Sequence, residues 1–193
     1  MANVKPFRAI RPSSALAAQV AALPYDVYNR EEAAEKVKGH PLSFLNIDRP
    51  ETQFDPSMDM YADCVYEKAK ENLDNMEEKG ILVQDQKACY YIYELVRKGK
   101  TQTGIVGCSS IDDYMNGVVK KHELTREDKE QDRIHHVDSC NANTGPIFLA
   151  CRYPDSLLTL MNNWKDHHEA AYDFTEEDQI THRVWVIDED EVI

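Results

Sequence analysis

Apolar residues spaced four apart mark the clearest element of the chain, a helix expected over residues 60–79. The repeat runs from Tyr61 to Leu73, and charged side chains occupy the opposite face. Gly80 follows immediately, as glycine commonly does beyond a helix C-terminus. The pattern therefore predicts an amphipathic helix with one face in a core.

A second pattern predicts a β-hairpin in the middle of the chain. Residues 88–96 (ACYYIYELV) are rich in aromatic and β-branched side chains, and residues 101–110 return as a partner strand. Lys98, Gly99 and Lys100 lie between them as the turn.

Shorter runs predict the remaining elements, which give an α+β fold class. The expected strands cover residues 4–10, 42–47, 81–83, 118–120, 147–151 and 184–187. Helices are expected over residues 155–168 and in a short segment that ends at Val20. A further helix is expected to begin after its cap, Asn29, and to end at Gly39. Residues 1–154 are expected to form one domain. Residues 155–193 are expected to be an extension or the start of a following domain, because the last strand has no obvious partner after it.

The segment over residues 118–146 carries the densest set of chemically useful side chains. A short strand leads into Thr125-Arg-Glu-Asp128, which matches a capping box: the threonine hydroxyl would accept a backbone N–H and the aspartate would reach back. A charged helix is then expected from Arg126 to Asp138. The free N–H groups and partial positive charge of such a helix start suit phosphate.

Three side chains share one face of this expected helix. Lys129, Arg133 and His136 lie at i, i+4 and i+7, so together with Thr125 and Arg126 they are candidate phosphate ligands. The same spacing is typical of a solvated face whose charges pair with one another, and on spacing alone that is the commoner case. The corner also lacks a glycine-rich phosphate loop.

Two carboxylates and a histidine are candidates for chemistry. Asp26 lies in Leu-Pro-Tyr-Asp-Val, an extended corner after Pro24, and Glu123 directly precedes the helix start. Glu123 would bind a metal, Glu123 or Asp26 would orient or deprotonate a hydroxyl group, and His122 or His136 would support the developing charge. We expect Asp26 and Glu123 to converge on one site; the alternative is two unrelated turn or cap residues.

Composition excludes some classes of protein. The 193 residues carry 22 Lys and Arg against 35 Asp and Glu, and the net charge of −13 disfavours nucleic acid or anionic membranes as partners of the whole surface. No apolar run is long enough to span a membrane. The five cysteines include no Cys-x-x-Cys pair and are expected to be reduced thiols, which favours a cytoplasmic location.

Several runs of the sequence resemble the bacterial family called domain of unknown function 1015. They are PFRAIRP, LPYDV, SFLNIDRPE, TQTGIV, KKHELT, DRIHHVD and NANTGPIFL, and they extend over essentially the whole chain. Members of that family are commonly longer, so the chain resembles their N-terminal half and is expected to be truncated. The family looks related to the ParB/sulfiredoxin superfamily, which implies a small mixed sheet with flanking helices. The Gly-(Glu/His)-Arg type signature of that superfamily is missing here, because the matching positions, Lys121 to Thr125, contain no glycine.

The resemblance implies a ligand and two alternative functions. The ligand would be ATP or ADP, with Mg²⁺ bound through Glu123, and Asn143 and Thr144 of the NANTGP run would join the phosphate-binding residues. One function is a kinase that transfers a phosphoryl group to a small hydroxyl substrate such as serine. The other is a non-catalytic, nucleotide-gated switch related to chromosome-partition proteins and able to form a homodimer. A plain structural or interaction domain is the third alternative.

Overall fold

Small antiparallel sheets and short helices build the part of the chain that the structure describes, and the fold is mixed α+β. This computed structural model covers residues 2–122, 124–152, 154–176 and 178–189. The chain divides into two units. The sheet unit comprises Met1–Ala18, Val83–His122 and Leu149–Ile193, and the helical unit comprises Gln19–Leu82 and Glu123–Phe148.

The predicted hairpin lies at the centre of the sheet unit. Strands β4 (Tyr90–Arg97) and β5 (Lys100–Val106) pair antiparallel. The two residues between them both have positive φ, 49° at Lys98 and 74° at Gly99, as a type I′ turn requires. Such a turn matches the right-handed twist of the flanking strands, and the prediction of a hairpin is confirmed.

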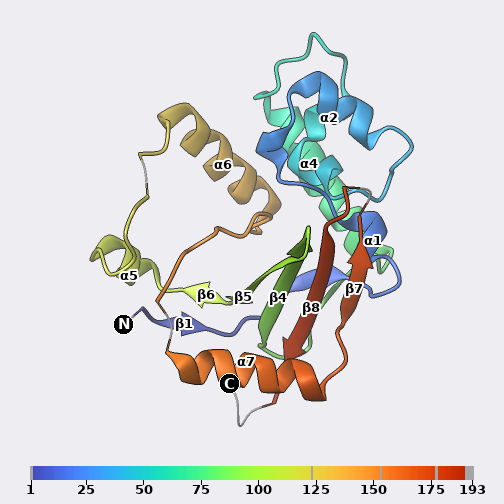
Figure 1. The fold of residues 1–193 in the computed structure, drawn as a ribbon. Helices are drawn as coiled ribbons and strands as arrows, with labels where there is room; N and C mark the ends of the chain where they lie inside the picture. Colours follow the sequence, from blue (N-terminus) through green and yellow to red (C-terminus); the bar gives the residue numbers. More distant parts are fainter. Residues whose placement is uncertain (1, 123, 153, 177, 190–193) are drawn as a thin grey trace. The chain divides into compact units, whose positions relative to one another are not determined.

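Two later strands complete a four-stranded sheet. Strand β8 (Thr181–Ile187) pairs with β4, and β7 (Tyr172–Thr175) pairs with β8, which gives the order β5-β4-β8-β7 (Figure 1). The strand predicted over residues 184–187 therefore has two partners, both earlier in the chain. Residues 155–193 contribute β7, β8 and α7 (Asp155–His167) to the sheet unit.

Helix α7 covers one face of this sheet. The buried cluster joins Met161 and Trp164 of α7 to Ile92 of β4 and to Trp185 and Ile187 of β8. Ile92 lies opposite Trp185, and the two β8 residues are two positions apart, so all three strand side chains point to the same face. Burying each such side chain contributes about 1.5–3 kcal/mol to folding.

An ion pair with tyrosine partners holds the N-terminal segment in the sheet unit. Arg11 of β2 (Ile10–Pro12) pairs with Asp85, with Nη2 2.8 Å from Oδ1, and also donates to Tyr172 Oη at 2.9 Å. Tyr91 donates to the same aspartate at 2.6 Å. These contacts join three segments far apart in sequence, those of Arg11, of Asp85 and Tyr91, and of Tyr172.

Helix α4 (Asp63–Glu78) forms the core of the helical unit, as its four-residue repeat predicts. Val65, Ala69 and Leu73 are buried on its inner face. Helix α2 (Arg30–Val37) also begins where predicted, because Asn29 caps it in a box with Glu32 in which both hydrogen bonds measure 2.9 Å.

The strand predicted over residues 42–47 is wrong. The end of this run lies in a helix, α3 (Leu45–Asp48), in which Leu45 and Ile47 are buried. A short apolar run satisfies burial as a helix or as a strand, and its periodicity does not distinguish the two.

Two further strand predictions are also wrong. Residues 118–120 and 147–151 adopt neither strand nor helix. Ile147 and Phe148 are 74% and 80% exposed, so the apolar composition of this run was not sufficient for it to form a strand. A strand needs a hydrogen-bonded partner, which composition does not specify.

Short elements connect these parts. They are β1 (Val4–Lys5), α1 (Ala17–Val20), the 3-10 helices η1 (Tyr25–Val27) and η2 (Pro50–Gln53), β3 (Leu82–Gln84), β6 (Cys108–Ser109) and α5 (Ile111–Met115). Strand β1 pairs with β6 and β2 with β3. All five cysteines are free thiols. Among the described residues, none of the helices combines the length and the apolar character that crossing a bilayer demands.

The Ile92→Ala substitution should destabilise the sheet unit. Ile92 is fully buried, so the lost side chain leaves a cavity, and the free energy of unfolding should fall by about 2–5 kcal/mol. Urea unfolding followed by the fluorescence of Trp164 and Trp185, which line this core, would measure the change. Ile111→Ala is the matched control: that side chain is 78% exposed, and an unfolding midpoint lowered equally by both substitutions would contradict the assigned core.

Candidate functional site

Helix α6 (Glu127–Cys140) begins one residue later than predicted. Its N-cap is Arg126, whose side chain makes no capping hydrogen bond, so the predicted box between Thr125 and Asp128 is wrong. Asp128 instead accepts from the neighbouring arginine, with Nη2 2.6 Å from Oδ2. A carboxylate gains more from a bidentate guanidinium than from a single backbone N–H, which explains the exchange of partners.

The first turn of α6 is acidic. Glu127, Asp128 and Glu130 all lie in it and complement the helix dipole. An anion placed directly at the helix start would therefore meet three carboxylates. Attraction for a phosphate has to come from cationic side chains farther along the helix.

Helix α6 is fixed to α4 by polar contacts. Tyr66 of α4 donates to Asp132 Oδ1 at 2.8 Å, and its ring stacks on His135 with centroids 4.0 Å apart. Burial and the hydrogen bond to the carboxylate raise the pKa of Tyr66, so its hydroxyl remains a donor. These contacts fix the rotation of α6 about its axis, and with it the direction of the side chains on its pocket face.

His136 is the most deeply buried of the predicted phosphate ligands. Its Nε2 lies 2.9 Å from the carbonyl oxygen of Ile47, and because that oxygen only accepts, Nε2 carries the proton and donates. The other ring nitrogen, Nδ1, lies 3.9 Å from Cys140 Sγ. The imidazole therefore links α6 to α3. Because its N–H group is used in that hydrogen bond, the ring presents only an edge, without a free N–H group, to the space beside the helix.

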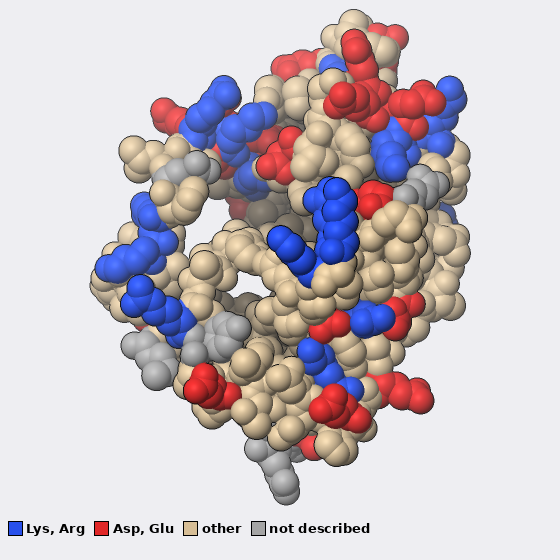
Figure 2. All heavy atoms as spheres, in the orientation of Figure 1, with Lys and Arg blue, Asp and Glu red and all other residues tan. Residues whose placement is uncertain are grey.

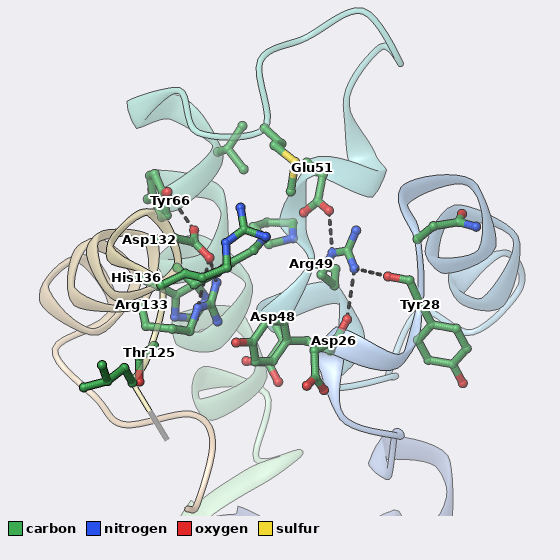
Figure 3. Close-up of a pocket in the computed structure, with 18 residues that line it drawn as sticks. Asp26, Tyr28, Asp48, Arg49, Glu51, Tyr66, Thr125, Asp132, Arg133 and His136 are labelled. Carbon is green, nitrogen blue, oxygen red and sulfur yellow. Dashed lines mark hydrogen bonds and ion pairs between the residues drawn. The ribbon is translucent and has the colours of Figure 1, made fainter. Parts of the chain in front are cut away.

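A cavity of about 640 Å³ opens beside α6 within the helical unit (Figure 3). Its volume lies in the range of small-molecule sites. We call it the α6 pocket. It is lined by Tyr25, Asp26, Tyr28, Asn29, Asp48, Arg49, Pro50, Glu51, Met60, Val65, Tyr66, Leu124, Thr125, Arg126, Lys129, Asp132, Arg133 and His136.

The pocket brings together most of the residues singled out from the sequence. Those that line it are Asp26, Thr125, Arg126, Lys129, Arg133 and His136. Thr144 lies next to it, because its hydroxyl donates to Asp48, whereas Asn143 is exposed and does not line it. His122 belongs to the sheet unit. Glu123 lies outside the described residues, so its roles as base and metal ligand, and its convergence with Asp26, stay predictions.

The basic side chains of the pocket are held by partners. Arg133 donates to Asp132 Oδ2 from Nη2 at 3.0 Å, and its guanidinium lies 4.3 Å from the centre of the Tyr25 ring. Lys129 Nζ contacts Tyr61 Oη at 3.4 Å. The two cations therefore occupy defined positions along α6, which lowers the entropy cost of ordering them around an anion.

Arg49 and Glu51 form a buried ion pair that the sequence analysis did not identify. The guanidinium donates from Nε to the Glu51 carboxylate and from Nη1 to two carbonyl oxygens of the η1 region, those of Tyr25 at 2.9 Å and Tyr28 at 2.7 Å (Figure 3). Both residues are less than 10% exposed. The pair thereby fixes the turn that carries Asp26. The signal in the sequence is the charged run Asp-Arg-Pro-Glu directly after an apolar segment.

Asp48 is a second residue that the sequence analysis missed. It ends α3, is half-buried, and accepts from Thr144 Oγ1 at 2.7 Å. Burial raises the pKa of this carboxyl, whereas the hydrogen bond from Thr144 and the charges of His136 and Arg133 act in the opposite direction. A carboxylate kept in a desolvated place at a cost in stability is typical of a functional site.

The pocket therefore combines both signs of charge with aromatic surface. Tyr25, Tyr28 and Tyr66 offer ring faces or edges, and acidic and basic groups alternate around them. On the face drawn in Figure 2, the basic side chains lie in several separate groups, most with acidic side chains beside them. Such a site suits a small ligand that carries anionic, aromatic and hydroxyl groups better than an extended polyanion.

Comparison with known proteins identifies a family. A family model described as "Protein of unknown function (DUF1015)" matches residues 4–193. No curated protein and no solved structure matches the chain.

The Asp48→Asn substitution should stabilise the protein at neutral pH. Folding raises the pKa of Asp48 above its ordinary value of 3.8, so the ionised carboxylate destabilises the folded state at neutral pH, and asparagine removes that cost while still accepting from Thr144. The gain should shrink as the pH falls through the raised pKa towards 3.8, where both states bind the proton. Urea unfolding at a series of pH values would measure it; a loss of stability at neutral pH would contradict the assigned cost.

Proposed function

The chain belongs to the DUF1015 family, and on the geometry of the α6 pocket we propose that its helical unit binds a nucleoside phosphate there. The observation that carries the proposal is the convergence on one cavity of Lys129, Arg133 and the tyrosines of η1 and its C-cap. The cations and the rings come from segments about a hundred positions apart in the sequence, yet they line one space of nucleotide size.

Each part of the ligand has a complementary group. Lys129 and Arg133 would neutralise the phosphates, with Arg126 and Thr125 at the exposed mouth. A planar base would stack on the ring of Tyr25 or Tyr28, as bases do on aromatic side chains.

Mg²⁺ would enter with the phosphates. Among the described residues no group of three or more His, Cys, Asp or Glu side chains is placed to hold a metal ion. Mg²⁺ commonly keeps several waters and takes most of its other ligands from substrate phosphates, so one or two carboxylates suffice. We assign this role to Asp26, an exposed carboxylate among the described residues that line the pocket.

The reaction we propose is phosphoryl transfer to a small hydroxyl compound such as serine. The acidic residues Asp26 and Asp48 line the same cavity as the cations, which suits a substrate that carries an ammonium group beside its hydroxyl. Phosphoryl transfer depends mainly on positioning and charge neutralisation, which paired, ordered side chains supply. The ParB/sulfiredoxin-like relationship is part of the proposal, and the small sheets with accompanying helices support it. We also propose that the protein is cytoplasmic and that it forms a homodimer.

Calorimetry with ATP, ADP and CTP in the presence of Mg²⁺ tests the binding. Lys129→Ala should weaken the binding of the preferred nucleotide about tenfold or more, since a charge-assisted contact contributes about 1.5–3 kcal/mol. Lys68→Ala is the matched control, because it removes the same charge from the same unit outside the pocket, where Lys68 pairs with Glu71. Absence of binding at millimolar nucleotide, or equal weakening by both substitutions, would exclude this site.

Turnover separates a kinase from a switch. Incubation of the protein with the bound nucleotide, Mg²⁺ and a panel of small hydroxyl compounds that includes serine should give a phosphorylated product, detected by phosphorus NMR. A protein that binds nucleotide and dimerises but yields no product would be a nucleotide-gated switch instead.

A further inference from the structure

Four carboxylates that line the α6 pocket differ sharply in how they are engaged. Glu51 is buried against Arg49. Asp132 accepts from Tyr66 through Oδ1 and from Arg133 through Oδ2, so both of its oxygens are occupied. Asp132 is therefore not available to a ligand without breaking a structural contact, and Glu51, which is only 3% exposed, is already neutralised by its ion pair with Arg49.

Asp48 and Asp26 remain, and their surroundings are unlike. Asp26 is exposed on the three-residue helix η1, within the turn that Arg49 holds by its carbonyl groups. Asp48 is half-buried at the end of α3, and Thr144 occupies its Oδ1. Its Oδ2 makes no hydrogen bond to any other residue in the described ranges, so one oxygen is fixed in place and the other is left for the pocket.

We infer that Asp48 is the carboxylate that accepts the proton of the substrate hydroxyl, and that Thr144 is the residue that positions it. This inference rests on the proposed phosphoryl transfer. Figure 3 draws Asp48, the last residue of α3, between the labelled side chains of α6 on one side and those of Arg49 and Glu51 on the other. A base fixed by a neighbouring hydroxyl on a short helix is held more precisely than a base on an exposed turn.

The step balances without any further reactant. The substrate oxygen attacks the terminal phosphorus of the nucleoside phosphate, and the bond from that phosphorus to its bridging oxygen breaks, so the shortened nucleotide leaves with the electron pair. The hydroxyl proton passes to Asp48 Oδ2. The positive charges of Lys129 and Arg133 lie along α6, where they would offset the charge of the transferring group.

The electrostatic surroundings suit a base. Burial raises the pKa of the Asp48 carboxyl, and the hydrogen bond from Thr144, followed by the charges of His136 and Arg133, opposes this without cancelling it. Cys140 on the same helix has a pKa raised to about 11, chiefly by burial and also by Asp48, so it stays a neutral thiol. The remaining charged groups that line the pocket are Asp26, Arg49 and Glu51 on the neighbouring elements, and Arg126, Lys129 and Asp132 on α6 and its N-cap.

Two substitutions test the assignment in the full chain, with ATP or whichever nucleotide the calorimetry shows to bind. Asp48→Asn should lower kcat about 100-fold or more, the usual loss for a general base, while the Kd for the nucleotide changes less than about threefold. Because the same substitution is expected to stabilise the fold, loss of turnover would not reflect unfolding. Asp74→Asn, on the exposed face of α4 where Asp74 pairs with Lys70, is the matched control and should leave kcat unchanged.

The Thr144→Val substitution gives a measurement, the kcat–pH profile, that a purely structural role of Thr144 would leave unchanged. The hydroxyl stabilises the ionised carboxylate, so its removal should raise the pKa of Asp48 and shift the acid limb of the kcat–pH profile to higher pH. An acid limb that stays in place, or an Asp48→Asn protein with kcat within threefold of the unmodified chain, would overturn the assignment. If the unmodified chain binds no nucleotide or yields no product, the proposed function itself fails and this inference falls with it.

Discussion

The ion pair between Arg49 and Glu51 is the interaction on which the arrangement of the α6 pocket depends. Taking two charges out of water costs several kcal/mol for each ion, and the cost is offset only where the geometry is good and the remaining donors are satisfied. Arg49 has these features at two of its nitrogens, because Nε donates to the glutamate and Nη1 donates to the carbonyl oxygens of Tyr25 and Tyr28. The turn that bears Asp26 is therefore attached to the helical unit through its backbone, which leaves its side chains free to face a ligand.

A second set of contacts fixes the opposite wall. His136 donates to the carbonyl oxygen of Ile47, Tyr66 donates to Asp132, and Thr144 donates to Asp48, so α6 and the segment after it are attached to α3 and α4 by polar groups. Apolar packing alone tolerates small rotations of a helix, whereas hydrogen bonds with defined directions do not. Different hydrogen bonds thus hold the two walls, and the cavity is the space that remains between them.

Sequence patterns correctly predicted those elements whose structure is determined by residues close to one another in the chain. The four-residue repeat of α4, the Asn29 cap of α2 and the Lys98-Gly99 turn each encode their structure within a few residues, and all three are confirmed. The shared face of Lys129 and Arg133 followed from helical spacing in the same way. The capping box at Thr125 failed because Arg126 competes for Asp128, a choice between partners that a motif does not contain.

Residues whose role depends on contacts with distant parts of the chain were not identified from the sequence. Asp48 and Arg49 follow the run that was predicted as a strand, and nothing local shows that such a charged stretch will be buried. The partner of Asp48 is Thr144, which is 96 positions away. The strand predicted over residues 147–151 failed for the related reason that sheet pairing is decided by non-local contacts.

The helical unit is built from two separate stretches of chain, Gln19–Leu82 and Glu123–Phe148, with the β4–β5 hairpin encoded between them. During synthesis, α4 is translated long before α6, so Tyr66 of α4 cannot form its hydrogen bond to Asp132 until the later helix has been made. Closing so long a loop slows folding, because entropy is lost before the contacts form. On the ribosome, the face of α4 that packs on α6 is therefore left without this partner until the residues of α6 have been translated.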